Sequence, residues 1–92
     1  MSCRYPTHSI ELAYPPSVVK TMLDNTLVNR QRARYDDKDN CYVLNDEHDR
    51  IYLAGTNGDQ HSMVSISNTN QHMCNVLLCI EDAFSFYHKV VY

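Results

Sequence analysis

Short runs in which apolar and polar residues alternate, separated by turn-forming residues, recur along most of this 92-residue chain. Such a period of two indicates strands with one buried face. This alternation predicts strands over residues 8–14, 62–67 and 84–92. Residues 41–44 and 50–54, each followed by a turn signal, are predicted as two further short strands. Residues 73–80 are almost continuously apolar, which is typical of a strand buried on both faces. Asn57-Gly58 predicts a tight hairpin, because both residues accept a positive φ.

One segment, residues 16–29, has helical spacing instead. Pro16 suits a first helical turn, where its missing N–H would be unpaired in any case. Side chains three or four residues apart would form one apolar stripe, made by Val19, Met22, Leu23, Thr26 and Leu27. The polar residues 30–40 are interpreted as an exposed connection. The predicted fold class is therefore α+β in a single domain, residues 1–92: one N-terminal helix packed on a curved antiparallel sheet, or small partly open barrel, of about five to six strands.

The charge balance argues against a nucleic-acid partner. Eleven acidic and eight basic residues give a net charge of −3, whereas phosphate binding draws on a basic surplus. The longest apolar run, residues 76–80, is far shorter than the roughly 20 residues that span a membrane, so no membrane partner is expected. The first residues lack the apolar region of a signal peptide. We therefore expect an intracellular location, in the cytoplasm or nucleus, with all four cysteines as reduced, structural thiols.

Residue types that bind metals do not occur here with the spacing of a zinc site. They are Cys41, Cys74, Cys79, His48, His61 and His72. Cys74 and Cys79 are an odd number of residues apart, so a strand would point them to opposite faces. Neither Gly-x-Ser-x-Gly nor Cys-x-x-Cys is present. We expect no metal, no cofactor and no enzymatic activity, and a cysteine-dependent small enzyme or thiol sensor ranks third among the functions considered.

The sharpest local feature is a row of alternating arginines, Arg30, Arg32 and Arg34. In an extended segment their guanidinium groups would point the same way, and such groups bind phosphates and carboxylates bidentately. Three aspartates between residues 36 and 39 partly neutralise the row. It is interpreted as a solvated loop, with a partner-binding patch and an RNA site as the alternatives.

Residues 70–78, Asn-Gln-His-Met-Cys-Asn-Val-Leu-Leu, resemble the Sm-fold signature, in which an Asp-x-x-Met-Asn turn leads into an apolar strand. The resemblance covers nine residues and implies an RNA-binding Sm-like barrel. With an OB-like barrel, this is the alternative function, using the arginine row and stacking by exposed tyrosines. Cys74 is an extra residue within the match, and the Arg-Gly segment of that family is absent, so no family is assigned.

The last run, residues 84–92, has little to protect it as a sheet edge, because Lys89 is its only formal charge. Unpaired strand edges recruit other strands. A strand here would present Phe86, Val90 and Tyr92 on one face, although an interior strand remains the alternative. The predicted function is a small non-catalytic protein–protein interaction or regulatory domain, of the adaptor or inhibitor kind, which binds another protein or a second copy of itself through this edge.

Overall fold

The computed structural model describes residues 9–45 and 47–91, and for residues 86–91 it describes the backbone alone. Within these described residues, five strands, two α-helices and a π-helical segment follow one another. In chain order these are β1 (Ser9–Leu12), α1 (Pro16–Leu23), η1 (Asp24–Arg30), β2 (Arg34–Asp36), β3 (Cys41–Val43), β4 (Arg50–Thr56), β5 (His61–Ile66) and α2 (Gln71–Val91).

The strands form one open sheet in the order β1-β5-β4-β3-β2, and all neighbouring strands are antiparallel. The predicted α+β class is therefore confirmed, as an open sheet of five strands. The Asn-Gly hairpin is also confirmed: Thr56 pairs with His61, and Asn57 and Gly58 adopt φ angles of 52° and 65° between β4 and β5. A side chain at the Gly58 position would strain this turn.

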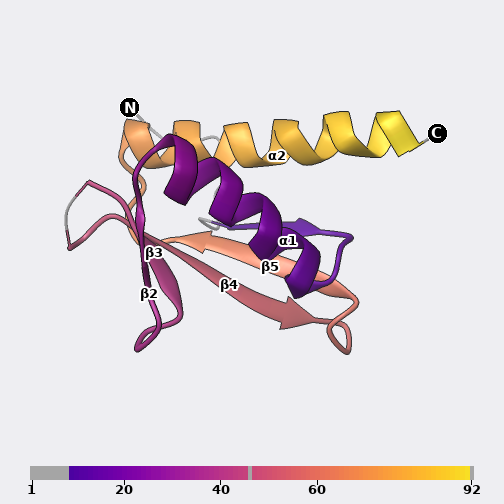
Figure 1. The fold of residues 1–92 in the computed structure, drawn as a ribbon, viewed down its shortest axis with the longest axis horizontal. Coiled ribbons are helices and arrows are strands. Elements are labelled where there is room, and N and C mark those ends of the chain that lie inside the picture. The colour runs from indigo at the N-terminus through magenta and orange to yellow at the C-terminus, as the bar shows by residue number, and fades with distance from the viewer. Residues whose placement is uncertain (1–8, 46, 92) are drawn as a thin grey trace.

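Both helices lie over the same face of the sheet, so the molecule has two layers (Figure 1). α1 contacts β4 and β5, whereas α2 contacts β1 and β5. The core lies between the layers and includes the fully buried side chains of Val19, Leu23, Leu27, Ile51, Val64 and Leu77. Strand residues that alternate with these face the other side of the sheet, where the side chain of Tyr52 is 38% exposed.

The predicted helix over residues 16–29 is confirmed, but its second half is wider than an α-helix. The carbonyl of Pro15 accepts hydrogen bonds from the N–H groups of Val18 and Val19, at 3.0 and 3.2 Å, which begins α1. From Asp24 onwards the turns are π-helical. The widening keeps Leu27 fully buried, in line with the aliphatic stripe of α1. Short π-helical segments are rare and occur frequently at functional sites.

The two predicted C-terminal strands, residues 73–80 and 84–92, are wrong, because residues 71–91 form the helix α2. The buried side chains Met73, Leu77, Ile80 and Phe84 are spaced by four, three and four residues, which is the helical period. The continuous run at 76–80 masked this spacing, since a short apolar run fits a buried strand and a buried helix equally well. The segment 30–40 is also more ordered than predicted, because it contains β2.

A polar network fixes the start of α2. The side-chain Oδ1 of Asn70 accepts a hydrogen bond from the N–H of Met73 at 2.9 Å, as an N-cap residue does. The carboxylate of Asp49 accepts hydrogen bonds at 3.1 Å from the side-chain amides of Asn68 and Asn70. The bond from Asn68 is the main cause that lowers the pKa of Asp49 below its usual value; burial opposes it and the bond from Asn70 adds to it. This network links the β3–β4 connection to the helix.

Within the part of the chain that the structure describes, no helix is both long enough and apolar enough to cross a membrane.

Candidate functional site

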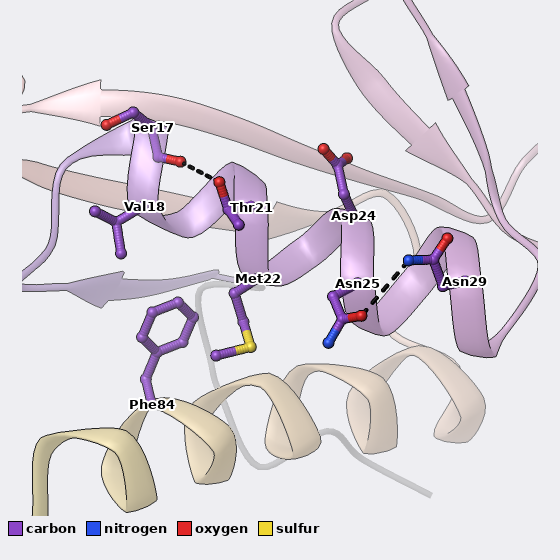
Figure 2. A pocket seen from close by; sticks show the side chains of 8 residues that line it. All are labelled: Ser17, Val18, Thr21, Met22, Asp24, Asn25, Asn29 and Phe84. Carbon is purple, nitrogen blue, oxygen red and sulfur yellow. Dashed lines mark hydrogen bonds between the residues drawn. The ribbon is translucent and has the colours of Figure 1, made fainter. Parts of the chain in front are cut away.

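A groove of about 800 Å³ opens between α1–η1 and α2 (Figure 2). Val18 and Met22 extend into it from α1, and Phe84 faces them from α2. Phe84 is buried and Met22 is half-buried, whereas Val18 is 38% exposed. These three side chains therefore give the groove an apolar floor that is partly open to solvent.

Uncharged polar side chains line most of the rest of the groove. Ser17 and Thr21 come from α1, and the hydroxyl of Thr21 donates to the carbonyl of Ser17 at 3.1 Å. Asn25 and Asn29 come from η1, and their side-chain amides contact each other at 3.5 Å, a long distance for a hydrogen bond. All four residues are exposed. The π-helical turns thus place two amide groups beside the apolar floor, where they can donate to or accept from a bound chain.

A second hollow, of about 460 Å³, also borders Phe84. It is lined by residues of β1, of the turn after β1, and of α2, namely Glu11, Leu12, Ala13, Tyr14, Glu81, Phe84 and Ser85. The ring centroids of Tyr14 and Phe84 are 5.0 Å apart, with their planes tilted by 41°. Phe84 is therefore shared by two neighbouring hollows and is held by an aromatic contact.

Behind the groove, Asp24 ties the helix to the sheet. Its side chain points away from Phe84 (Figure 2), and its Oδ1 accepts a hydrogen bond of 2.5 Å from the hydroxyl of Tyr42 on β3. The ammonium of Lys20 lies 3.2 Å from the same oxygen and 3.9 Å from the ring centroid of Tyr35. Burial, together with the neighbouring carboxylate, raises the pKa of Tyr42, so this phenol stays protonated. The cluster holds α1–η1 in place against β2 and β3.

The three arginines of the predicted row do not lie on one regular strand. Arg30 ends η1, Arg32 has a left-handed φ of 58°, and Arg34 begins β2, so the backbone is not regularly extended through the three. All three are exposed, and Ala33 between them is buried. Arg34 pairs with Glu47 at 3.1 Å, whereas Arg30 and Arg32 form no ion pair with the residues that the structure describes. The regular strand that would point all three guanidinium groups the same way is therefore not present in this segment, and a role in partner binding stays a prediction.

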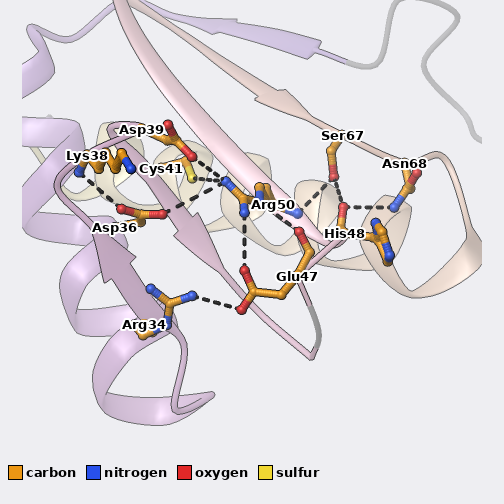
Figure 3. Close-up of polar contacts among 10 residues, drawn as sticks. All are labelled: Arg34, Asp36, Lys38, Asp39, Cys41, Glu47, His48, Arg50, Ser67 and Asn68. Atoms are coloured by element: carbon orange, nitrogen blue, oxygen red, sulfur yellow. Dashed lines mark hydrogen bonds and ion pairs between the residues drawn. The ribbon is translucent and has the colours of Figure 1, made fainter.

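Arg50, which sequence reasoning did not single out, is the most highly connected basic residue (Figure 3). Its guanidinium lies 2.8 Å from Asp39, 3.2 Å from Glu47 and 3.9 Å from Asp36, and it donates to the sulfur of Cys41 at 3.7 Å. The hydrogen bond to Asp39 raises its pKa above the ordinary value. With three carboxylates around one guanidinium, this cluster is saturated and stabilises the β2–β3 and β3–β4 turns.

The predicted C-terminal site residues do not form a strand edge. Phe86 and Val90 lie on α2, and their side chains are outside the described part of the chain, as is the whole of Tyr92. The edge strands of the sheet are instead β1 and β2. The prediction that residues 84–92 recruit a partner by strand addition is therefore wrong, because their backbone hydrogen bonds lie within a helix.

The cysteines differ from one another. Cys41 is a buried free thiol, and Cys79 is an exposed free thiol. Cys74 is buried and disulfide-bonded. The expectation of reduced, structural thiols is therefore wrong for Cys74 and, as regards burial, for Cys79. The prediction that Cys74 and Cys79 lie on opposite faces of a strand fails with that strand, since both belong to α2.

No group of three or more cysteine, histidine, aspartate or glutamate side chains in the described ranges is arranged to hold a metal ion. The segment that resembles the Sm signature, residues 70–78, begins α2, so it lacks the strand on which that resemblance depends. The chain matches no family model, no curated protein and no solved structure.

Sequence reasoning missed the groove because its two walls are far apart in the chain. The helical spacing predicts Met22 on the buried stripe, and the alternation of residues 84–92 predicts Phe84 on a strand. One signal was available, since the spacing of Met73, Leu77, Ile80 and Phe84 is helical. A second helix on an open sheet would have predicted a helix–helix interface.

Proposed function

We propose that this domain is a non-catalytic protein-binding module that takes an apolar segment of another protein into the groove between α1–η1 and α2. The observation that carries the proposal is the partly exposed apolar floor formed by Val18, Met22 and Phe84 between two helices. A groove of this kind, with an apolar floor and polar rim, is what helical or extended peptide segments bind.

Several features support binding rather than chemistry. The polar groups around the floor are hydroxyls and amides, which fix the orientation of a ligand but are weak acids and bases. The acidic residue of the groove, Asp24, directs its carboxylate to Tyr42 and Lys20 on the sheet side.

The intracellular location stays a prediction, and the disulfide of Cys74 is a feature more typical of oxidising compartments.

A peptide library displayed on phage and selected on the immobilised domain tests this proposal. Selected peptides are synthesised, and their affinities are measured by fluorescence anisotropy for the parent, Val18→Ser and Tyr52→Ser. Val18 and Tyr52 are equally exposed, at 38%, but lie on opposite faces of the molecule, so they form a matched pair. We expect Val18→Ser to weaken binding at least fivefold and Tyr52→Ser to leave it unchanged.

The opposite pattern, with binding lost in Tyr52→Ser alone, would place the site on the open face of the sheet and refute the groove. A library that yields no peptide above background would also count against the proposal. Sedimentation of the parent and of Val18→Ser tests whether the groove is instead occupied by a second copy of this chain. If the parent is a dimer that Val18→Ser dissociates, the groove binds a second copy of this chain.

A further inference from the structure

The turn that joins β4 to β5 projects from the end of the sheet (Figure 1), and none of its residues is among the described lining residues of the groove. Its first two residues, Asn57 and Gly58, are both exposed and both have left-handed φ angles. A Cβ built on Gly58 would meet no atom within 4 Å beyond its chain neighbours. Water can therefore reach the peptide group between the two residues.

Two groups in this turn make no hydrogen bond within the described ranges, namely the side-chain amide of Asn57 and the backbone N–H of Gly58. The turn is closed by a different bond, in which the carbonyl of Asn57 accepts from the N–H of Gln60 at 3.3 Å. The side chain of Asn57 is therefore free to change rotamer. Gly58 has no side chain that could hinder an approach to its own nitrogen.

We infer that Asn57 is a site of spontaneous deamidation in the folded protein, in which the backbone nitrogen of Gly58 attacks the side-chain amide and water completes the reaction. Asparagine is a thermolabile residue, and Asn57 is the only asparagine in the sequence that precedes a glycine. The modification is separate from the groove and needs no partner.

The reaction proceeds in two steps without oxidation or reduction. Base removes the proton of the Gly58 N–H, the nitrogen forms a bond to Cγ of Asn57, and the Cγ–Nδ2 bond breaks. The side-chain nitrogen leaves as ammonia, and a five-membered succinimide ring remains. Water then adds to one of the two ring carbonyl groups: opening at Cγ gives aspartate, whereas opening at the backbone carbonyl carbon gives isoaspartate, whose main chain runs through Cβ and Cγ.

Asn40 is an internal comparison within the same molecule. It is also exposed and has a left-handed φ of 53°. The residue that follows it, Cys41, is buried and begins β3, which pairs with a strand on each side. The side chain of Asn40 also contacts the hydroxyl of Tyr35 at 3.5 Å. A difference in rate between Asn57 and Asn40 therefore reports on the following residue and on the freedom of the side chain.

Isoaspartate would alter the turn itself, because it lengthens the main chain within the loop that the bond to Gln60 closes. The side chain of Asp59 occupies the space over Gly55, where an added Cβ would meet the Asp59 carboxylate and lie 3.2 Å from Cγ of Pro16. The turn thus lies close to the first residue of α1. We expect the isoaspartate form, separated by ion exchange, to melt at a lower temperature than the aspartate form.

Incubation of the purified protein at 37 °C and pH 8, followed by peptide mapping with mass spectrometry, tests the inference. The mass increase that accompanies replacement of NH₂ by OH is quantified at each asparagine over time. We expect Asn57 to deamidate at least tenfold faster than Asn40 and to give both aspartate and isoaspartate. At pH 6 the reaction should be at least fivefold slower, because less of the attacking nitrogen is deprotonated.

Two alanine substitutions in the same turn form a matched pair. Gly58→Ala adds a Cβ beside the attacking nitrogen and should slow deamidation at least tenfold; the left-handed φ strains this variant, so its folding is checked by a thermal melt. Gln60→Ala changes an exposed residue and leaves Asn57 and Gly58 intact, so its rate should equal that of the parent.

Equal rates at Asn57 and Asn40, or a Gly58→Ala variant that deamidates as fast as the parent, would overturn the inference. Urea below the unfolding transition separates the folded route from an unfolded one, because it raises the unfolded population. We expect the rate at Asn57 to stay constant in urea. A rate that rises in proportion to the unfolded fraction would show that the reaction requires unfolding, and the folded turn would then not be the site.

Discussion

Replacing Tyr42 by phenylalanine tests how much the polar cluster behind the groove contributes to folding. Tyr42 is fully buried, and its hydroxyl donates to Asp24 at 2.5 Å and accepts from the ammonium of Lys20 at 3.3 Å. The substitution keeps the ring, which packs edge-on against Tyr35 with centroids 4.8 Å apart. The change therefore removes one hydroxyl and leaves the apolar packing in place.

The expected loss follows from the hydrogen bond to the carboxylate. A hydrogen bond to a charged group is worth about 1.5–3 kcal/mol. Asp24 keeps its contact with Lys20, and its side chain is 46% exposed, so water replaces part of the lost bond. We therefore expect Tyr42→Phe to lower the free energy of unfolding by about 1–2 kcal/mol. For a domain of this size that corresponds to a decrease in Tm of about 5–12 °C.

Urea denaturation followed by circular dichroism at 222 nm measures this change, with the slope of the transition expected to stay constant. Tyr52→Phe is the control, because its ring lies on the open face of the sheet and is 38% exposed; it should stay within about 0.5 kcal/mol of the parent. A double-mutant cycle with Asp24→Asn should give a coupling energy of about 1 kcal/mol. A Tyr42→Phe variant as stable as the parent, or a cycle without coupling, would refute this account of the cluster.

Four further predictions concern the contacts described above. Leu27→Ala empties a fully buried site under η1 and should destabilise the domain by about 2–5 kcal/mol; a melt like that of the parent would contradict the burial of the π-helix. Asn70→Ala removes the cap of α2 and one donor to Asp49, which should cost about 1 kcal/mol by urea denaturation and reduce helical signal. Because the pKa of Asp49 is lowered in the folded state, its stabilising contribution is complete above the unfolded pKa of about 4 and is lost as the pH falls through the lower folded pKa. Stability measured between pH 6 and pH 2.5 should therefore decrease less steeply in Asp49→Asn, and parallel curves would exclude this residue as a cause. A maleimide reagent should label Cys79 in the native protein and Cys41 only after unfolding, and the reverse order would contradict their exposures.

Local signals predicted most of the chain up to residue 67. Asn57-Gly58 specifies its hairpin through backbone conformations that few other residues adopt, so no distant contact can easily override it. The apolar stripe from Val19 to Leu27 likewise fits a helical spacing and not the period of two of a strand. Residues 76–80 do not distinguish a helix from a strand, because five consecutive apolar residues fit both periods. Whether the segment is a helix is then indicated by the cap at Asn70 and by the spacing of apolar residues beyond the run.

The candidate site was less predictable than the fold, for a geometric reason. The groove exists only because Phe84 on α2 comes to lie opposite Val18 and Met22 on α1, and such long-range placement leaves no trace in either local pattern. The arginine row shows the converse error. Alternating residues point to one face only in a regular strand, and the left-handed φ of Arg32 interrupts the regular strand conformation.

The sheet order has a consequence for how the domain assembles during synthesis. β1 leaves the ribosome first but pairs with β5, the last strand to be made. Until β5 is available, Ile10 and Leu12 have no strand to lie beside, while β2 to β5 can form a local meander by successive hairpins. Contacts between residues close in sequence form faster than distant ones, because less chain entropy is lost. We expect β1 to join last, so a nascent chain stalled before β5 would expose the apolar side chains of β1 and α1 to chaperones.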